Sequence, residues 1–412
     1  MKSTKIPETP EKKWALLARI EPNILHWLGK IGTLENTQLY LVGGVVRDKF
    51  LGRKTLDIDI AVDGDVKKLG TKLAAELASC FEYHETFKTG SIKGPNNLHI
   101  DLAMTRTEKY PTPGQLPLVK KGTIDDDLLR RDFTINAMAI YLNQNGDLDK
   151  ILDPTNGRKD LSKGLIRVLH NKSFQDDPTR IFRAVRYSVR FSFKIEPHTA
   201  SLMRNAIKRI QYLSGERILY ELRCINKEKK SIKINIFKNL LEHGILDFLG
   251  KPLVKFSWQS FDKLQTEENC EFLCLFLSHF NYEKLSRLPL SKKCLKTIET
   301  LQKQQEIFSQ LTYISIPSKI FFFLRNFDER GLRILAETSA SKQKDKITAY
   351  LDLYKKVIIN TTGDDLKEMG LPPGPGYRKY LDKLLGIKID GYIKEKVDEI
   401  NMLKNWIKKE KE

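Results

Sequence analysis

Two neighbouring stretches decide the fold: LVGGVVRD at residues 41–48 and LDIDIAV at residues 56–62. In the second stretch apolar residues alternate with acids, so on a β-strand Asp57 and Asp59 project from one face and the apolar side chains from the other. In the first stretch two glycines follow a short strand and open a helix that Gly52 can end. The second glycine lies 13 residues before Asp57. One helix therefore returns the chain to a strand whose acids lie near the glycines.

A third acid extends this pattern, because Asp101 lies among apolar residues in the period-2 run 98–104. Two like charges held together are costly unless a cation neutralises them, and hard carboxylate oxygens suit Mg²⁺. A third carboxylate beside the pair would complete a two-metal centre. We predict that Asp57 and Asp59 bind Mg²⁺ and that Asp101 is the third member. The acids alone also fit an ordinary solvated strand face.

The glycine pair predicts a phosphate-binding turn. Gly43 and Gly44 let the backbone approach a ligand closely, and the helix that follows offers free N–H groups at its start. Arg47, one turn into that helix, can reach the same oxygens. Taken by itself, a Gly-Gly pair before a helix also fits a plain turn.

The composition is that of a soluble globular protein with a polyanionic partner. Of 412 residues, 71 are Lys or Arg and 52 are Asp or Glu, which gives a net charge of +19. Such a surplus favours nucleic acid, bound through phosphate contacts. The longest apolar run, around residues 320–324, is far too short to span a bilayer, and residues 1–13 do not resemble a secretory signal. We expect a cytoplasmic protein without a membrane segment or a stable protein partner.

The five cysteines form no CxxC pair and are odd in number. This pattern argues against a disulfide framework and against a zinc site. Cys270 and Cys274 are four residues apart in a helical stretch, and we predict that they belong to a helical core.

The chain changes character along its length. Residues 38–141 show period-2 segments with helical stretches between them, which indicates a mixed α/β unit. Strand signals vanish after about Leu165, and helical periodicity dominates from Pro178 onward. Residues 119–127, after the proline-rich stretch 111–117, read as a mobile loop that could act as a gate.

One helix concentrates arginines. Asp177 and Pro178 predict an N-cap followed by proline at the first helical position. At about 100° per residue, four arginines of this helix share one face and four apolar residues share the other. The arginines are Arg180, Arg183, Arg186 and Arg190; the apolar residues are Ile181, Ala184, Val185 and Val189.

With these motifs in order, the chain resembles the class II tRNA nucleotidyltransferases (CCA-adding enzymes) and bacterial poly(A) polymerases of the polymerase β nucleotidyltransferase superfamily. GGVVRD with DID is similar to the first motif of that family. The later motifs are RRDFTINA at 130–137, Asp153-Pro154 with Gly157 and Asp160-Leu161, DDPTR at 176–180, and Glu216-Arg217 with Glu221. The family usually has Glu before the Asp of the fourth motif, whereas this chain has Asp176, which leaves a role for the first position in doubt.

The resemblance implies an α+β fold with an N-terminal polymerase-β-like nucleotidyltransferase head built on a small mixed sheet, followed by all-helical neck, body and tail. We expect the head, with an N-terminal helix, at 1–150, the neck with the base pocket at 151–225, the body at 226–310 and a tRNA-binding tail at 311–412. Glu216, Arg217 and Glu221 are expected to brace the arginine helix.

The resemblance also implies functions for individual residues. Gly43, Gly44 and Arg47 would hold the triphosphate, and Arg131 would contact the nucleotide. Asp177 as acceptor and Arg180 as donor would read the edge that cytosine and adenine share, an amino group beside a ring acceptor. Arg183 and Arg186 would contact nearby phosphates, while Asp57 and Asp59 bind the metal.

The expected reaction adds C, C and A to the tRNA 3′ end from CTP and ATP, with pyrophosphate released and the helical half holding the acceptor arm by its backbone. The loop before Arg130 favours completion of the triplet. The alternatives are addition of CC alone or A alone, a poly(A) polymerase, and a non-catalytic RNA-binding module. The stretch after Asp59 lacks the GRRF-type basic run associated with the poly(A) branch.

Overall fold

A computed structural model of the chain describes residues 22–53, 57–93, 99–112, 114–265, 269–339 and 341–411. Leu56, Leu98 and residues 1–13, which entered the sequence analysis, lie outside these ranges. The chain divides into two compact units. The first comprises residues 1–221 and 235–248, and the second comprises residues 222–234 and 249–412.

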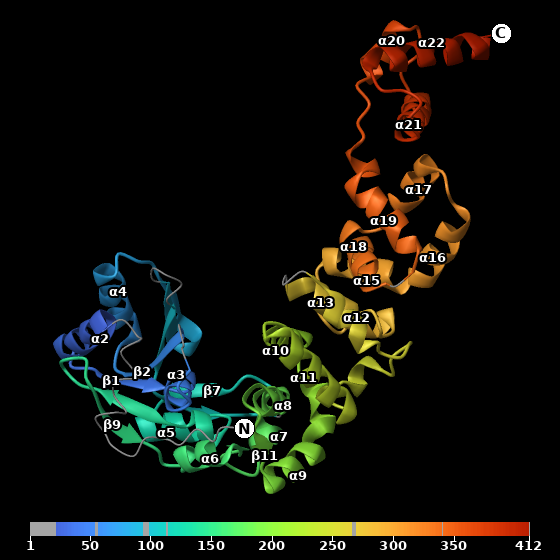
Figure 1. Ribbon diagram of the computed structural model, residues 1–412. Coiled ribbons are helices and arrows are strands. Elements are labelled where there is room, and N and C mark those ends of the chain that lie inside the picture. Colours follow the sequence, from blue (N-terminus) through green and yellow to red (C-terminus); the bar gives the residue numbers. More distant parts are fainter. Residues whose placement is uncertain are drawn as a thin grey trace. The chain divides into compact units, whose positions relative to one another are not determined.

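A seven-stranded sheet forms the core of the first unit (Figure 1). Its strand order is β3-β4-β5-β2-β1-β8-β9, and only β2 and β5 pair in parallel among the strands of this sheet. The strands are β1 (Gln38–Val42), β2 (Asp57–Asp63), β3 (Phe81–His84), β4 (Thr89–Lys93), β5 (His99–Met104), β8 (Ala139–Leu142) and β9 (Leu148–Leu152). Two small pairs complete the unit, antiparallel β6 (Arg106–Lys109) with β7 (Leu118–Lys121) and parallel β10 (Leu165–Ile166) with β11 (Lys194–Ile195).

The helices of the first unit are α2 (Pro22–Leu34), α3 (Gly44–Phe50), α4 (Val66–Glu76), α5 (Ile124–Leu129), α6 (Gly157–Lys163), α7 (Ser173–Asp176), α8 (Thr179–Phe191) and α9 (Pro197–Ala206). Residues of α10 (Gly215–Asn226) and α11 (Lys230–Glu242) fall in both units.

Different helices cover the two faces of the sheet. Ile58 and Ile60 of β2 are 1% exposed, on the face against which α2 and α4 pack. The acids of β2 alternate with these residues and therefore project from the opposite face. Further along that face Ala61 is buried against Leu128 of α5. Helix α5 thus covers the end of the acid-bearing face at Ala61. Asp57 and Asp59 lie next to this covered end on the same face.

The third sequence motif fixes helix α6 against the rest of the unit. Asp153 Oδ1 accepts a 2.6 Å hydrogen bond from the backbone N–H of Gly157, and Asp160 Oδ2 accepts bonds from Thr134 and Arg167. A Cβ at position 157 would lie 2.1 Å from the carbonyl oxygen of Thr134. Only glycine fits this close approach, so the motif stabilises the fold.

The second unit is helical throughout its described residues. Its helices are α12 (Trp258–Lys263), α13 (Asn269–Leu277), α14 (Tyr282–Leu285), α15 (Lys292–Gln302), α16 (Gln304–Tyr313), α17 (Pro317–Leu324), α18 (Glu329–Thr338), α19 (Gln343–Asp352), α20 (Gly363–Glu368), α21 (Gly376–Ile389) and α22 (Lys396–Lys411). Near the C-terminus, buried Glu399 accepts hydrogen bonds from the backbone of Asn360 and Thr361 and pairs with Lys388. Residues 369–375 join α20 to α21.

The predicted fold class is confirmed, with two local corrections. Residues 119–127, expected as a mobile loop, form most of strand β7 and the start of helix α5, where Thr123 and Asp126 make a capping box. Strand signals were expected to vanish after Leu165, but Lys194–Ile195 pairs with Leu165–Ile166. A two-residue strand is too short to leave a period-2 signal. The boundaries near residues 150, 225 and 310 stay predictions.

Across the residues that the structure describes, no helix combines the length and the apolar character needed to cross a membrane.

Candidate active site

Three carboxylates lie together on the acid-bearing face of the sheet. Asp57 and Asp59 are two residues apart on β2, and Asp101 lies directly opposite Asp59 on the parallel strand β5. Paired residues of neighbouring strands project from the same face. The arrangement expected from alternation alone is therefore present in the sheet, and His99 Nδ1 lies 3.4 Å from Asp101 Oδ2.

The electrostatics of these acids are unfavourable without a cation. Burial raises the pKa of Asp59, and the charges of Asp101 and Asp57 raise it further, against the lowering effect of Arg131. Burial also raises the pKa of Asp101, and the charge of Asp57 adds to that rise. A divalent cation would relieve this repulsion, and clustered carboxylate oxygens are the ligands that Mg²⁺ takes in proteins. The chemical type of these donors fits such an ion.

The glycine turn lies next to Asp59. Gly43 has φ +69° and ψ −123°, a conformation that favours glycine, and it directly precedes helix α3. A Cβ at Gly43 would lie 2.7 Å from Nη1 of Arg131 and 3.8 Å from Oδ2 of Asp59. A Cβ at Gly44 would lie 3.7 Å from the same Asp59 oxygen. A side chain here would fill the space between the turn, the acid and the arginine.

Arg131 is held at this position by an acid of helix α5. Its Nη2 lies 2.9 Å from Oδ2 of Asp127, and Oδ1 of Asp127 binds Arg130 at 2.6 Å. Arg130 also pairs with Glu108 of β6 at 2.7 Å. Buried Asp127 thus orients both arginines of the second motif, one toward Asp59 and one toward the β6–β7 hairpin.

Arg47 lines the same region but is 4% exposed and held within the protein. Its Nε donates to Asp48 at 2.9 Å and its Nη1 donates to Asn136 at 2.6 Å. The guanidinium also lies over the ring of Phe191, 4.6 Å from its centroid. These contacts lock its orientation, and a direct phosphate contact by Arg47 stays a prediction.

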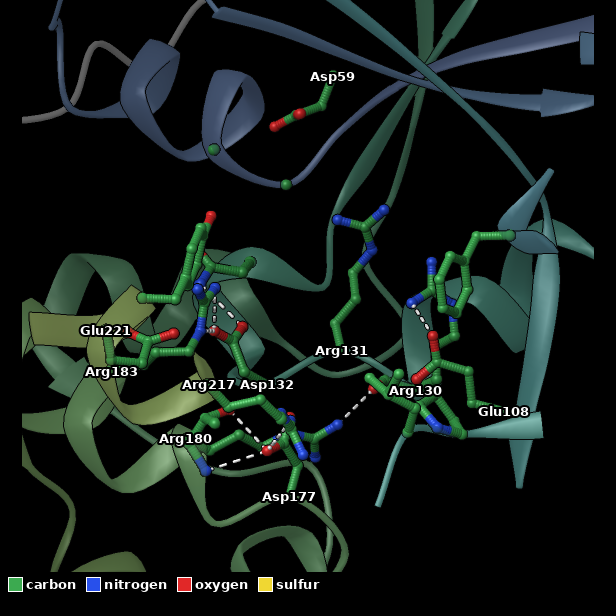
Figure 2. Close-up of a pocket in the computed structure, with 18 of the residues that line it drawn as sticks. Asp59, Glu108, Arg130, Arg131, Asp132, Asp177, Arg180, Arg183, Arg217 and Glu221 are labelled. Atoms are coloured by element: carbon green, nitrogen blue, oxygen red, sulfur yellow. Dashed lines mark hydrogen bonds and ion pairs between the residues drawn. The ribbon is translucent and has the colours of Figure 1, made fainter. Parts of the chain in front are cut away.

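A cavity of about 900 Å³ joins Asp59, the Gly43–Gly44 turn and Arg131 to the arginine helix, whereas Asp57 and Asp101 are not among its lining residues. In Figure 2, Arg131 points toward Asp59, while Asp177, Arg180 and Arg217 gather on the other side of Arg131. The cavity is lined by Gly43, Gly44, Arg47, Asp59, Phe87, Thr89, Arg106, Glu108, Tyr110, Leu116, Pro117, Arg130, Arg131, Asp132, Asn136, Asp177, Thr179, Arg180, Arg183, Tyr187, Glu216, Arg217, Tyr220 and Glu221.

Asp177 and Arg180 lie at the start of helix α8, each fixed by neighbours. Asp177 Oδ1 accepts bonds from the backbone and hydroxyl of Thr179 and from Arg217 Nη2 at 2.7 Å. Helix α8 begins at Thr179, one residue after the predicted start, and Asp177 still binds its first N–H. Arg180 donates to the Ser173 hydroxyl at 2.6 Å and to the Arg130 carbonyl at 2.8 Å.

The arginine face of α8 is covered rather than solvated. Arg183 binds Oδ2 of Asp132 at 2.7 Å, and Arg186, 7% exposed, lies 3.6 Å from Glu221. Arg186 does not line the cavity. The expected bracing by the fifth motif is confirmed for Glu221, and Arg217 instead holds Asp177. Helical periodicity gave the two faces, but only the tertiary fold supplies the acids that bury the basic one.

Comparison with known proteins agrees with this geometry. The model of the poly A polymerase head domain family matches residues 39–167. An A-adding tRNA nucleotidyltransferase of Geobacter sulfurreducens is 34% identical over 411 residues, which cover 92% of this chain and 46% of that protein. The chain thus spans about half the length of that relative. A second A-adding tRNA nucleotidyltransferase, from Halalkalibacterium halodurans, is 32% identical over 403 residues, 93% of this chain and 92% of that protein. The chain belongs to the tRNA nucleotidyltransferase family.

Other members of this family match less of the chain or were compared as structures. A CC-adding tRNA nucleotidyltransferase, also from Halalkalibacterium halodurans, is 33% identical over 186 residues, 45% of this chain and 43% of that protein. The solved apo form II of a CCA-adding enzyme is 29% identical with a TM-score of 0.77, covering 97% of this chain and 99% of that one. The Thermotoga maritima CCA-adding enzyme complexed with tRNA is 27% identical with a TM-score of 0.70, covering 98% and 100%.

Several residues of this tRNA nucleotidyltransferase site carried no separate signal in the sequence. Asp127 lies in the acidic run 125–127, which reads as the first turn of a helix. Glu108 and Tyr110 reach the cavity because the β6–β7 hairpin folds beside Arg130, a long-range contact that no local pattern records. Asp132 was visible within the RRDFTINA motif, but its pairing with Arg183 needed the structure.

The buried pair of Asp132 with Arg183 predicts a pH-dependent stability. Burial alone would raise the pKa of Asp132, but Arg183 and Asn136 outweigh burial and lower the pKa to about 2. Because the folded pKa lies below the unfolded value of about 3.9, the stabilisation is present above about pH 4 and is lost as the pH falls toward about 2. It amounts to about 2–3 kcal/mol.

We expect Asp132→Asn to lower the free energy of unfolding by at least about 2–3 kcal/mol at pH 7, and this deficit to shrink as the pH falls from about 4 to about 2. Urea unfolding of both proteins across this pH range measures it. Exposed Asp149→Asn on β9 is the control and should match the wild type. A deficit for Asp132→Asn that stays constant with pH would contradict the assignment.

Proposed function

We propose that this chain extends the 3′ end of tRNA and that the terminal adenosine, taken from ATP, is among the nucleotides it adds. The observation that carries the proposal is the juxtaposition of Asp59 with the Gly43 turn at one side of a cavity whose other side holds Asp177 and Arg180. Asp101 is the strand partner of Asp59. A nucleoside triphosphate needs these two environments at once: a charged site for its phosphates and a donor-acceptor pair for its base.

The relatives support the terminal adenosine in particular. Both A-adding relatives match more than nine-tenths of the chain, whereas the CC-adding protein of Halalkalibacterium halodurans matches 45% of it. The CCA-adding structures also match almost the full chain. Addition of A is common to every full-length match described above. Addition of the two C residues as well, the activity expected from the sequence, is the second candidate, and the near-complete coverage of the CCA-adding structures supports it.

Asp57, Asp59 and Asp101 are proposed to hold the divalent cations. When bound, Mg²⁺ would polarise the phosphate oxygens and neutralise charge on the reacting groups. The raised pKa values of Asp59 and Asp101 support this assignment, because an added cation would stabilise their charged forms.

The chain's own residues position the triphosphate against these acids. The Gly43–Gly44 turn leaves room for phosphate oxygens beside Asp59, and Arg131 faces that space with its orientation fixed by Asp127. Arg131 would balance the negative charge of the phosphates. The 3′ hydroxyl of the tRNA then displaces pyrophosphate from the α-phosphorus, and catalysis rests mainly on positioning and charge.

Asp177 and Arg180 would select the base without a nucleic-acid template. Adenine presents an amino donor beside the N1 acceptor, so a carboxylate next to a guanidinium matches it. Asp177 uses Oδ1 for Thr179 and Arg217, so its Oδ2 is the oxygen on which base reading would depend. Anchoring of Arg180 by Ser173 and Arg130 keeps its guanidinium rigid, which favours discrimination. Guanine reverses the donor and acceptor and would be rejected.

The basic surplus of the chain suits the tRNA partner. A net charge of +19 favours binding through backbone phosphates, which every tRNA shares. We assign this contact to the helical neck, body and tail at 151–412.

The decisive experiment offers the full-length protein three tRNAs, lacking CCA, ending in C-C, or complete, with each nucleoside triphosphate separately and with Mg²⁺. Sequencing the products reads the activity. Addition of A to the C-C end supports the proposal, and additional C incorporation on the first substrate establishes the second candidate. Long A tails on every substrate would identify a poly(A) polymerase instead. Inactivity on all three tRNAs despite binding would indicate a non-catalytic RNA-binding protein.

The base-reading pair makes a selectivity prediction. Arg180→Ala should reduce the preference for ATP over GTP, measured as the ratio of kcat/KM values, by at least about tenfold, because guanine would no longer oppose a fixed donor. Arg190→Ala on the same helix, outside the cavity lining, is the matched control and should keep the wild-type ratio. Thermal unfolding of both variants checks folding. An unchanged ratio in folded Arg180→Ala would remove the base-reading role.

A further inference from the structure

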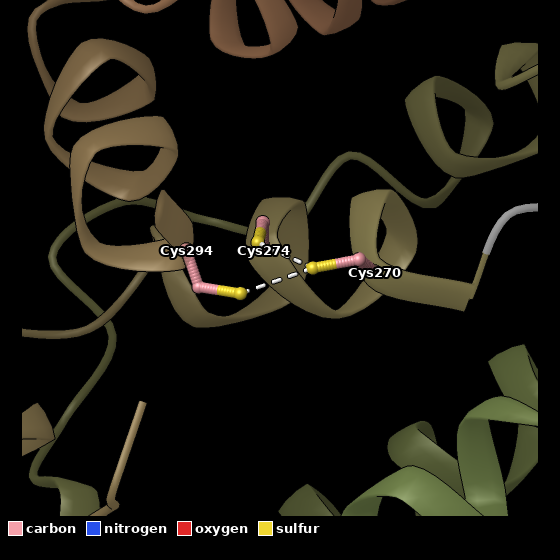
Figure 3. Close-up of side chains that lie close together, drawn as sticks. All are labelled: Cys270, Cys274 and Cys294. Carbon is pink, nitrogen blue, oxygen red and sulfur yellow. Dashed lines mark hydrogen bonds between the residues drawn. The ribbon is translucent and has the colours of Figure 1, made fainter. Parts of the chain in front are cut away.

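Three cysteines of the second unit converge at one point, far along the chain from the residues of the proposed catalytic cavity. Cys270 and Cys274 lie one turn apart on α13, and Cys294 lies in the first turn of α15. Cys270 Sγ is 3.7 Å from Cys274 Sγ and 3.0 Å from Cys294 Sγ. Figure 3 shows the thiols pointing toward one another from the two helices. The sequence predicted that Cys270 and Cys274 belong to a helical core, but it did not predict that Cys294 lies beside them.

The spacing of the three sulfurs suits a shared metal ion. Ligand atoms of all three residues lie within 4.8 Å of one another. A tetrahedral Zn²⁺ with Zn–S bonds of about 2.3 Å separates its sulfurs by about 3.8 Å, close to the 3.7 Å between Cys270 and Cys274. The Sγ atoms of Cys270 and Cys294 are 3.0 Å apart, so they would have to separate by about 0.8 Å for all three sulfurs to bind one ion. A small rotation of the Cys294 side chain would be enough.

The position of the cluster suits ligands that bind as anions. Cys294 is at the N-terminal end of an 11-residue helix, where a negative charge is stabilised. Cys274 is 2% exposed, whereas Cys270 and Cys294 are half-buried. An ion can therefore reach the cluster from solvent and be held against a buried sulfur.

We propose that Cys270, Cys274 and Cys294 form a three-thiolate site for a soft divalent metal ion, with Zn²⁺ as the ion to test. Thiolate sulfurs select soft and borderline cations, and Zn²⁺ accepts three protein ligands with water in a fourth position. The absence of a CxxC pair in the sequence argued against a zinc site. A site assembled from one helix and the start of another does not need that spacing, since the i, i+4 pair already presents two sulfurs on one face.

The role of such a site would be structural. It would link α13 to α15, two helices that pack against each other in the second unit. A disulfide between Cys270 and Cys294 is the competing explanation. The distance between their sulfurs would have to shorten from 3.0 Å to about 2.05 Å. Such a disulfide would not involve Cys274. The convergence of three thiols rather than two favours the metal.

The test uses the full-length protein, reduced and stripped of metal with a chelator, then loaded with Zn²⁺ and freed of excess ion. Elemental analysis should find about one equivalent of zinc per chain, and the zinc-loaded protein should unfold at a higher temperature than the stripped protein. Cys270→Ser and Cys294→Ser, both at half-buried positions, should each lose most of the bound zinc. Cys224→Ser, also half-buried, is the matched control and should retain it.

Zinc retained equally by wild type and by a Cys270→Ser, Cys274→Ala, Cys294→Ser triple variant would overturn the proposal. So would wild-type protein that binds no zinc above the level of that variant. Mass analysis of the reduced protein after alkylation covers the competing explanation: a Cys270–Cys294 disulfide that survives the reduction also overturns the proposal. Circular dichroism confirms that the variants are folded. None of these readouts depends on nucleotide addition, so the outcome is independent of the proposed enzymatic activity.

Discussion

The parallel pairing of β2 with β5 is the constraint on which the candidate site depends. Its register sets Asp59 opposite Asp101, and alternation along β2 adds Asp57 on the same face. A shift by one residue would turn all of the β2 acids into the apolar face that α2 and α4 cover. The buried isoleucines of β2 and β5 therefore fix the position of the acids, because their burial is lost in any other register.

Charge balance connects the sheet to the arginine helix. Around the cavity, acids hold arginines at defined positions: Asp127 holds Arg130 and Arg131, and Asp132 holds Arg183. A buried guanidinium without a partner would be costly, so these pairs fix side-chain directions as well as charge. Burial raises the pKa values of Asp59 and Asp101, and neighbouring acids on the same face of the sheet raise them further. Burial also raises the pKa of Glu221, but that carboxylate lies beside Arg186.

Local sequence patterns predicted the parts of this protein whose geometry is local. Alternation placed Asp57 and Asp59 on one face, and helical periodicity separated the arginines of α8 from Ile181. Contacts between distant segments escaped prediction. The acids that cover the arginine face and the approach of Cys294 to α13 join residues 24 or more positions apart. The β6–β7 hairpin, which replaces part of an expected loop, pairs residues 9 to 15 positions apart. No periodicity records such contacts. The fold class was predicted from the resemblance to the nucleotidyltransferase family that the ordered motifs carry.

The central claim is that Asp59, on the acid-bearing face of β2, supports nucleotide transfer to a tRNA end. Single-turnover incorporation of labelled ATP into tRNA ending in C-C tests it most directly, with Asp59→Asn compared with Asp63→Asn on the same strand. We expect Asp59→Asn to fold, since the change removes like-charge repulsion, and to lose activity by roughly a hundredfold or more. Asp63→Asn should remain close to the wild type. Equal activity of wild type and Asp59→Asn would contradict the account.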